Sequence, residues 1–242
     1  MSRKSQRNRP SPGSQSAAAS EAAAARGSSR RSLVLGIVIA LLAVLAGSFL
    51  FSSKSTQPSG TEDGARAAAL ASEHSPTVGD PGARVHIVEF LDPACETCAT
   101  FYPLVKQVMA QNPGKIRLSV RHAAFHQGSE YVVRLLEASR KQDKYWQTLE
   151  TLFATQAQWA VNHTVQPQLA LQAVAGVGLN LEQLTADMNA PDVVERAQRD
   201  HADAMALKVT ATPEYFVNGR QMPSFGEQQL LTLIGEELQK AY

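Results

Sequence analysis

Residues 85–98 read VHIVEFLDPACETC, and this stretch decides the fold. Its first seven residues are mostly apolar and β-branched, which is typical of a buried strand. Asp92 and Pro93 end that strand. Cys95 then begins a segment, up to Gln111, whose apolar residues recur at helical spacing. A second alternating run follows at 115–120, so strand, helix and strand within about 35 residues predict a βαβ unit.

The chain beyond this unit predicts a helical region and then a second α/β half. Residues 129–140 and 145–158 are amphipathic, and further helices are expected at 168–175 and 180–208, with Pro191 as a candidate break in the last. A third strand is expected at 215–217, where Asn218-Gly219 gives a hairpin signal, followed by a short strand near Gln221 and Met222 and a closing helix at 227–240. This order predicts a split α/β domain with a helical insert between its halves.

The N-terminal region predicts a membrane anchor. Residues 1–31 carry seven Lys or Arg and one acidic residue, a net charge of +6, and we expect a disordered cytoplasmic tail. Residues 32–51 contain no charge and are mostly apolar, so a helix there would span roughly 30 Å, the thickness of a bilayer core. The positive-inside rule then sends everything after Lys54 across the membrane. A signal peptide cleaved near Val44 and Ala46 and a twin-arginine signal at Arg30-Arg31 are the alternatives.

The remaining domain boundaries follow from composition. Residues 52–77 form a polar linker, and we expect the folded domain at 78–242 with its helical insert at about 128–208. After residue 31 the chain holds 16 basic and 21 acidic side chains, a net charge of −5. A mildly acidic body does not attract phosphate backbones, so nucleic acid is excluded as a partner.

The chain has two cysteines, Cys95 and Cys98, both on the exported side, where disulfides persist. A bond between them closes too small a loop to staple distant segments. Unpaired N–H groups and the positive end of the dipole at a helix start stabilise a thiolate on Cys95. Cys98, one turn further, is placed to attack a mixed disulfide formed on Cys95. We therefore predict a dithiol that passes two electrons by thiol–disulfide exchange.

Other interpretations of the CxxC pair stay open on the residues alone. A Cys2His2 zinc site would need His122 and His126, which are four residues apart. A chaperone-like binding module would hold Cu(I) with the two soft thiolates. A tethered structural subunit with a vestigial CxxC is a third alternative.

A second motif reads TATPEYFVNG, residues 210–219. Pro213 enters a strand although it lacks the N–H that a central strand needs. A cis bond between Thr212 and Pro213, which would expose backbone groups to an extended substrate, explains this position. An ordinary edge-strand proline is the alternative.

These two motifs, with the longer runs GDPGARVHIVEFLDPACETC (79–98) and RHAAFHQGSEYVVRLLEASRKQDKYWQTLETLF (121–153), resemble the DsbA-like family of thioredoxin-fold thiol–disulfide oxidoreductases. The resemblance covers about 78–242 and implies an α/β, thioredoxin-like fold with a helical insertion, preceded here by one N-terminal transmembrane helix. It implies that Pro213 is cis, faces the CxxC motif and binds substrate together with Thr212. It also implies that Glu89 is a buried acid that relays a proton to or from Cys98, where the alternative is a solvent-facing acid.

The resemblance further implies that the protein needs no cofactor, and it argues against a metal site because His126 then occupies a loop position that the family fills without metal. The expected partners are cysteine-containing protein substrates and a membrane redox partner of DsbB or DsbD type. The expected location is the bacterial inner membrane, single-pass, with the catalytic domain in the periplasm or outside the cell membrane.

The motif departs from the family at Glu96-Thr97, where many members have Pro-His. An acid beside the thiolate should raise the pKa of Cys95, and a less stable thiolate makes a weaker oxidant. Whether the protein forms, isomerises or reduces disulfides stays open.

Overall fold

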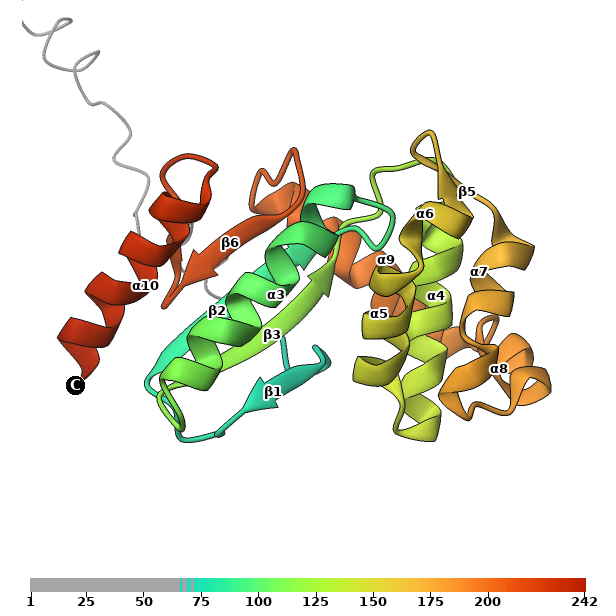
Figure 1. Cartoon of the computed structure of the whole chain (residues 1–242), viewed down its shortest axis with the longest axis horizontal. Coiled ribbons are helices and arrows are strands. Elements are labelled where there is room, and N and C mark those ends of the chain that lie inside the picture. The colour runs from blue at the N-terminus through green and yellow to red at the C-terminus, as the bar shows by residue number, and fades with distance from the viewer. Residues whose placement is uncertain (1–65, 67–68, 71) are drawn as a thin grey trace, which may run out of the picture. The chain divides into compact units, whose positions relative to one another are not determined.

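The computed structural model describes Arg66, residues 69–70 and residues 72–242 (Figure 1). The tail and the membrane span expected at 1–31 and 32–51 lie outside these residues, as does most of the linker. Within the described part of the chain, no helix combines the length and the apolar character that crossing a bilayer requires.

Five strands form one sheet in the order β1-β3-β2-β6-β7. The central strand β2 (Val85–Leu91) has the bounds expected from the sequence and pairs in parallel with β3 (Ile116–His122). On its other side β2 pairs antiparallel with β6 (Glu214–Val217). The antiparallel edge strands are β1 (Thr77–Gly79), which the sequence reading missed, and β7 (Arg220–Gln221). A helix connects the parallel pair, so the expected βαβ unit is present.

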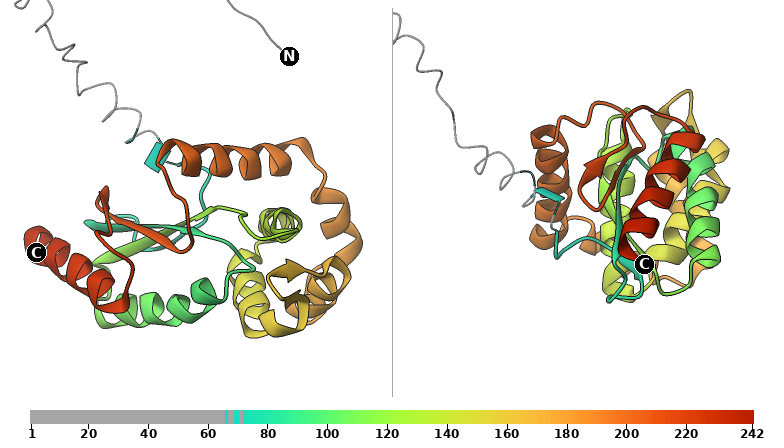
Figure 2. Two further views of the ribbon diagram at one scale, coloured as in Figure 1. Left: turned by 90° about the horizontal axis from the view of Figure 1, so that it is seen from above. Right: turned by 90° about the vertical axis from the view of Figure 1, so that its left-hand side faces the viewer.

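Helices cover both faces of this sheet. Helices α3 (Glu96–Gln111) and α10 (Glu227–Ala241) lie against one face and α9 (Pro191–Ala206) against the other (Figure 2). Strand β2 is therefore buried on both sides: Ile87 and Leu91 belong to the larger core, and Val88 and Phe90 to the smaller core beside α9. This double burial explains why β2 reads as an almost continuous apolar run.

The insert between β3 and β6 is helical, as expected. Its helices before α9 are α4 (Ser129–Ser139), α5 (Tyr145–Ala154), α6 (Gln156–Trp159), α7 (Pro167–Ala173) and α8 (Leu181–Asp187), with short 3-10 turns at Arg140–Gln142 and Ala175–Val177. The candidate break at Pro191 is confirmed, and the segment expected at 180–208 forms two helices, because Pro191 occupies the first turn of α9 and holds Ala190 in an extended conformation.

The insert also contains a small hairpin that the sequence reading missed. Strands β4 (Ala160–Val161) and β5 (Thr164–Val165) pair antiparallel around the two-residue turn Asn162-His163. Strands of two residues are too short to show an alternating pattern, so the run reads as loop.

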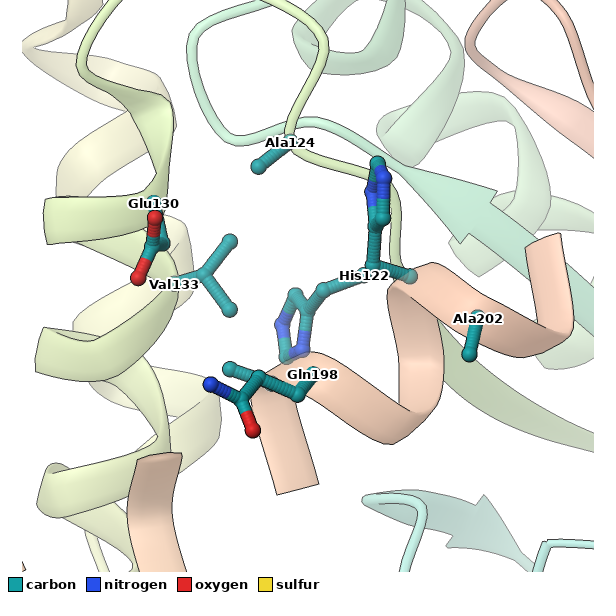
Figure 3. Close-up of a pocket in the computed structure, with 8 residues that line it drawn as sticks. His122, Ala124, Glu130, Val133, Gln198 and Ala202 are labelled. Carbon is teal, nitrogen blue, oxygen red and sulfur yellow. The ribbon is translucent and has the colours of Figure 1, made fainter. Parts of the chain in front are cut away.

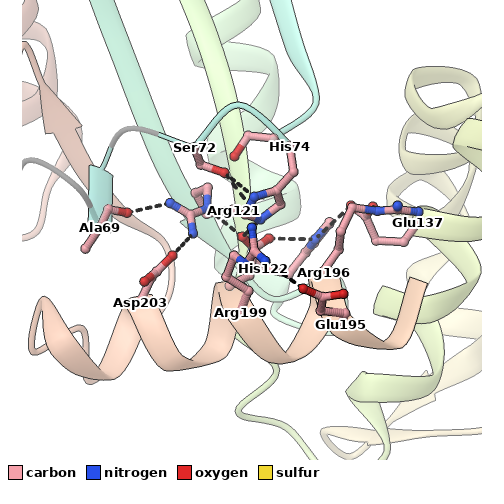
Figure 4. A network of polar contacts seen from close by, with 12 residues as sticks. Ala69, Ser72, His74, Arg121, His122, Glu137, Glu195, Arg196, Arg199 and Asp203 are labelled. Atoms are coloured by element: carbon pink, nitrogen blue, oxygen red, sulfur yellow. Dashed lines mark hydrogen bonds and ion pairs between the residues drawn. The ribbon is translucent and has the colours of Figure 1, made fainter. Parts of the chain in front are cut away.

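A buried ionic network joins α9 to the sheet (Figure 4). The guanidinium of Arg121, fully buried on β3, donates to Asp200 Oδ1 at 2.6 Å, to Asp203 Oδ2 at 2.5 Å and to the carbonyl of Ala69 at 2.6 Å. His74 Nε2 lies 2.8 Å from the same Asp200 oxygen. Because each charge is paired and hydrogen-bonded, the network fixes the position of α9 without leaving a buried charge exposed to an apolar core.

Candidate active site

Cys95 and Cys98 lie at the start of α3, directly behind the carboxyl end of β2. Cys95 is the N-cap residue of the helix, and its own N–H donates to the carbonyl of Asp92 at 3.0 Å. Both thiols are free; Cys95 is 6% exposed, and Cys98 is fully buried one turn inside. The pair therefore presents one sulfur near the surface and one beneath it.

The segment before β6 lies against the first of these sulfurs. The peptide bond between Thr212 and Pro213 is cis, and the Cys95 thiol donates to the carbonyl of Thr212 at 3.3 Å. This is the arrangement that the sequence predicts for the TATPEYFVNG motif. Segments more than a hundred residues apart in sequence thus meet at one thiol.

The surroundings of Cys95 stabilise its thiolate. A hydrogen bond from the Cys98 thiol lowers the pKa of Cys95 to about 5, with burial opposing and further support from the N–H groups of Cys98 and Thr97 and from the Thr212 side chain. Glu96 is not among the groups that shift the pKa of Cys95, and its carboxylate lies 3.2 Å from His163 Nδ1. The start of α3 therefore stabilises the Cys95 thiolate, as the sequence predicts, and the Glu96 carboxylate does not offset this stabilisation.

Cys98 has the opposite character. Burial, the hydrogen bond to Cys95 and the negative charge of Glu89 all raise the pKa of Cys98 well above its usual range. At neutral pH the pair is therefore one thiolate and one thiol, with the charge on the outer sulfur.

Glu89 is fully buried on β2, so it does not face solvent. Burial raises its pKa to about 8, and the negative charge of Cys95 adds to this while a hydrogen bond from Tyr215 opposes it. That bond joins the Tyr215 hydroxyl to Glu89 Oε1 at 3.0 Å, across the β2–β6 pairing. Among the described residues Glu89 Oε2 has no hydrogen-bond partner. The sequence predicts Tyr215 only as a strand residue, and its hydrogen bond to Glu89 follows from the strand register.

Sequence reasoning also missed Asp92, which it read as a strand terminator. This buried carboxylate accepts five hydrogen bonds, from the backbone of Ala94, Phe125 and His126, from His126 Nδ1 and from the Ser129 hydroxyl. It joins the turn before α3 to the loop before α4. A second support comes from the insert, where Gln156 Nε2 donates to the carbonyls of Pro93 and Cys95 at 2.8 and 3.1 Å.

A groove of about 520 Å³ lies beside the cis bond. Its lining includes two of the residues expected to bind substrate, together with one from the CxxC motif and an exposed aromatic ring (Thr212, Pro213, Thr97 and Phe225). The ring of Phe225 packs on Phe101 of α3, with the centroids 4.8 Å apart. The groove offers backbone and apolar surface next to Cys95, which suits an extended peptide.

The two histidines considered for a Cys2His2 site have other polar partners and are not grouped with the cysteines. His122 is buried, with Nε2 2.9 Å from the Tyr145 hydroxyl, and it lines a pocket of about 370 Å³ between α4 and α9 (Figure 3). His126 is held by Asp92 in the loop before α4. In the part of the chain that the structure describes, no group of three or more potential metal ligands includes a cysteine.

The comparisons with known proteins agree with this geometry. A model of the thioredoxin family matches residues 71–236. The chain belongs to the thioredoxin family. The structure of a thioredoxin-like oxidoreductase from Silicibacter pomeroyi is 28% identical, with a TM-score of 0.62, over 72% of this chain and 98% of that one. Alpha-DsbA1 of Wolbachia pipientis, 20% identical, shares the fold with a TM-score of 0.63 over 73% of this chain and 97% of its own.

The first of these neighbours is a thioredoxin-like oxidoreductase and the second is a DsbA, so the resemblance drawn from the two motifs is confirmed, and the comparisons support a DsbA-like oxidoreductase. The Na(+)/H(+) antiporter NhaA of Herminiimonas arsenicoxydans is 30% identical over 158 residues, which are 65% of this chain and 24% of the antiporter. The chain thus spans about a quarter of the length of the curated relatives that it matches.

Proposed function

We propose that this chain is an exported, membrane-tethered thiol–disulfide oxidoreductase that exchanges disulfides with cysteine-containing proteins. The observation that carries the proposal is the opposite pKa shifts of the two cysteines, lowered to about 5 for Cys95 and raised for the fully buried Cys98. An attacking sulfur must be a thiolate within reach of a partner, whereas a resolving sulfur must stay protonated until the mixed disulfide has formed.

In the first step the Cys95 thiolate attacks one sulfur of a substrate disulfide. A Cys95–substrate disulfide forms, and the other substrate sulfur leaves as a thiolate. The groove lined by Thr212 and Pro213 supports this step, because an extended chain paired with the Thr212 backbone brings its sulfur to Cys95.

In the second step Cys98 loses its proton and attacks the Cys95 sulfur, which releases the substrate's second thiolate. Glu89 is the proposed proton acceptor. Once Cys95 is in a mixed disulfide, the negative charge that helps to raise the Glu89 pKa is gone, so Glu89 ionises more readily just when Cys98 must be deprotonated. The protein dithiol ends as a disulfide, and two electrons have passed to the substrate. Disulfide formation is these two steps in reverse, and isomerisation begins with the first step and ends when a different substrate sulfur attacks the mixed disulfide.

The buried position of Cys98 favours exchange over the alternative of a Cu(I)-binding module. Both sulfurs of a two-cysteine Cu(I) site must be thiolates. Burial and the Glu89 charge oppose ionisation of Cys98, and they act against such a site.

The proposed place of the protein is the bacterial inner membrane, with one span at 32–51 and the catalytic domain in the periplasm. The uncharged 20-residue stretch behind a +6 tail supports this topology. A membrane protein of DsbB or DsbD type is the proposed redox partner, because a dithiol that turns over must be returned to its starting state.

Trapping of mixed disulfides tests the exchange. Cys98→Ser should accumulate disulfide-linked substrate proteins on non-reducing gels, since the resolving sulfur is lost, and Cys95→Ser should trap almost none. The opposite pattern, or no adducts in either variant, would overturn the proposal. A reporter that is active only outside the cytoplasm, fused after Tyr242, tests the topology separately. A cytoplasmic signal would exclude export, and a soluble, shortened protein would exclude the anchor.

A further inference from the structure

Three side chains with metal-binding atoms gather beside the dithiol without including either sulfur. Glu96 is the first residue of α3, His126 lies in the loop before α4, and His163 is at the tip of the β4–β5 hairpin. Each offers one ligand atom, and these atoms all lie within 4.8 Å of one another. The two imidazole rings stack with their centroids 5.4 Å apart, and Glu96 Oε2 lies 3.2 Å from His163 Nδ1.

Asp92 fixes the orientation of the His126 ring. Its Nδ1 lies 2.8 Å from Oδ2 of the fully buried Asp92, which leaves Nε2 as the nitrogen available to an ion. A carboxylate behind a histidine ligand sets the tautomer and increases the ligand's basicity, and metal-binding histidines are almost always supported in this way.

His163 occupies an unusual position for its residue type. Asn162 and His163 form the two-residue turn of the hairpin, and both have left-handed backbone conformations, with φ of 51° and 58°. Such turns favour glycine at the second position. The ion pair between His163 and Glu96 is more than half exposed on both sides, and exposed pairs contribute little to stability. Holding the hairpin in place is therefore a weak reason for a histidine here.

We propose that Glu96, His126 and His163 form a binding site for a divalent transition-metal ion, with Zn²⁺ as its representative. Two imidazoles and one carboxylate are the donor set of zinc sites that keep a fourth position open. Ligand atoms around tetrahedral Zn²⁺ are about 3.3–3.5 Å apart at the usual bond lengths. The present separations reach up to 4.8 Å, so the exposed side chains of Glu96 and His163 would have to rotate for all three ligand atoms to meet that range. The proposal departs from the expectation, drawn from family resemblance, that the chain has no metal site.

A bound ion would join three segments that are separate in the sequence. It would connect the insert hairpin, through His163, to the first turn of α3 and to the loop before α4. Because both cysteines stand outside the ligand set, the site stays available when the dithiol is oxidised.

Zinc titration of the oxidised, untagged full chain tests the proposal, since a Cys95–Cys98 disulfide leaves no thiolate to bind the ion. Calorimetry with ZnCl2 should show binding that is roughly tenfold or more weaker in His163→Gly. Glycine suits the left-handed turn, so this variant removes the ligand and keeps the hairpin. His201→Asn, which changes an exposed histidine on α9, should bind Zn²⁺ like the unmodified protein.

Thermal unfolding gives a second readout. Zn²⁺ should raise the melting temperature of the oxidised protein and of His201→Asn by similar amounts, and raise that of His163→Gly by less, because stabilisation by an ion that binds only the folded state falls as its affinity falls. Absence of binding to the oxidised protein would overturn the proposal, as would equal affinity in His163→Gly. Neither result affects the exchange activity proposed for the two sulfurs.

Discussion

Replacing Cys98 by alanine should raise the pKa of Cys95, because the Cys98 thiol is the strongest of the groups that lower it to about 5. A hydrogen bond to a charged group contributes about 1.5–3 kcal/mol. At about 1.4 kcal/mol per pKa unit, its loss moves the Cys95 pKa up by about one to two units, to about 6–7.

This shift is large enough to measure at mildly acidic pH. With a pKa of about 5, roughly 90% of Cys95 is thiolate at pH 6, whereas a pKa of about 6–7 leaves only about 10–50%. Alkylation by iodoacetamide at pH 6 should therefore be about two- to tenfold slower in Cys98→Ala, and the two rates should converge above about pH 8.

Cys98→Ser is the matched control, since serine keeps a hydroxyl donor of similar size at the same buried position. Its Cys95 pKa, read from the pH profile of alkylation or from thiolate absorbance, should stay closer to that of the unmodified protein than the alanine variant's does. Equal pKa values in the alanine and serine variants would refute the reasoning, because the donor at residue 98 would then have no influence.

Glu89→Gln should slow the resolution of a Cys95 mixed disulfide by about 10²-fold in single-turnover experiments, since glutamine accepts no proton, and should leave the Cys95 pKa unchanged; an unaltered resolution rate would show that Glu89 moves no proton. Asp200→Asn should lower the free energy of unfolding in urea by about 3–5 kcal/mol, because it leaves the fully buried Arg121 short of a charged partner. Glu195→Gln, which breaks an exposed pair with Arg199, should change it by less than about 0.5 kcal/mol, and equal losses would contradict the buried role. Against the opposing effect of burial, hydrogen bonds from His122 and His74 hold the pKa of Asp200 far below its usual range. The stabilisation by ionised Asp200 is therefore fully present above about pH 4 and shrinks as the pH falls further. Between about pH 4 and 2 the free energy of unfolding should fall less steeply in Asp200→Asn than in the unmodified protein. Identical slopes would show that Asp200 does not cause this loss of stability.

The βαβ unit and the helical insert could be read from the sequence because their signals are local. The buried run of β2, the break after it and the helical spacing beyond Cys95 all lie within a few residues of one another. The site could be read in part for the same reason, since the CxxC and TATPEYFVNG motifs are short and each contains its own chemistry.

The rest of the site depends on contacts between distant segments. Tyr215 meets Glu89 through strand register, Gln156 reaches the turn before α3 from the insert, and His163 approaches Glu96 from a hairpin of two-residue strands. No sequence pattern within a single segment predicts these contacts. The proximity of His163 to Glu96 likewise cannot be predicted from the residues around position 96.

Cys95 and Thr212 are 117 residues apart in the sequence, so the ribosome makes them at different times. A chain is made from its N-terminus, and each of its domains folds as a unit. The helix start that stabilises the thiolate needs only residues close to Cys95, whereas the Thr212 segment that covers and guides this sulfur is made much later. Both the reactivity and the selectivity of Cys95 are therefore complete only after the segment at Thr212 has been made and the domain has folded.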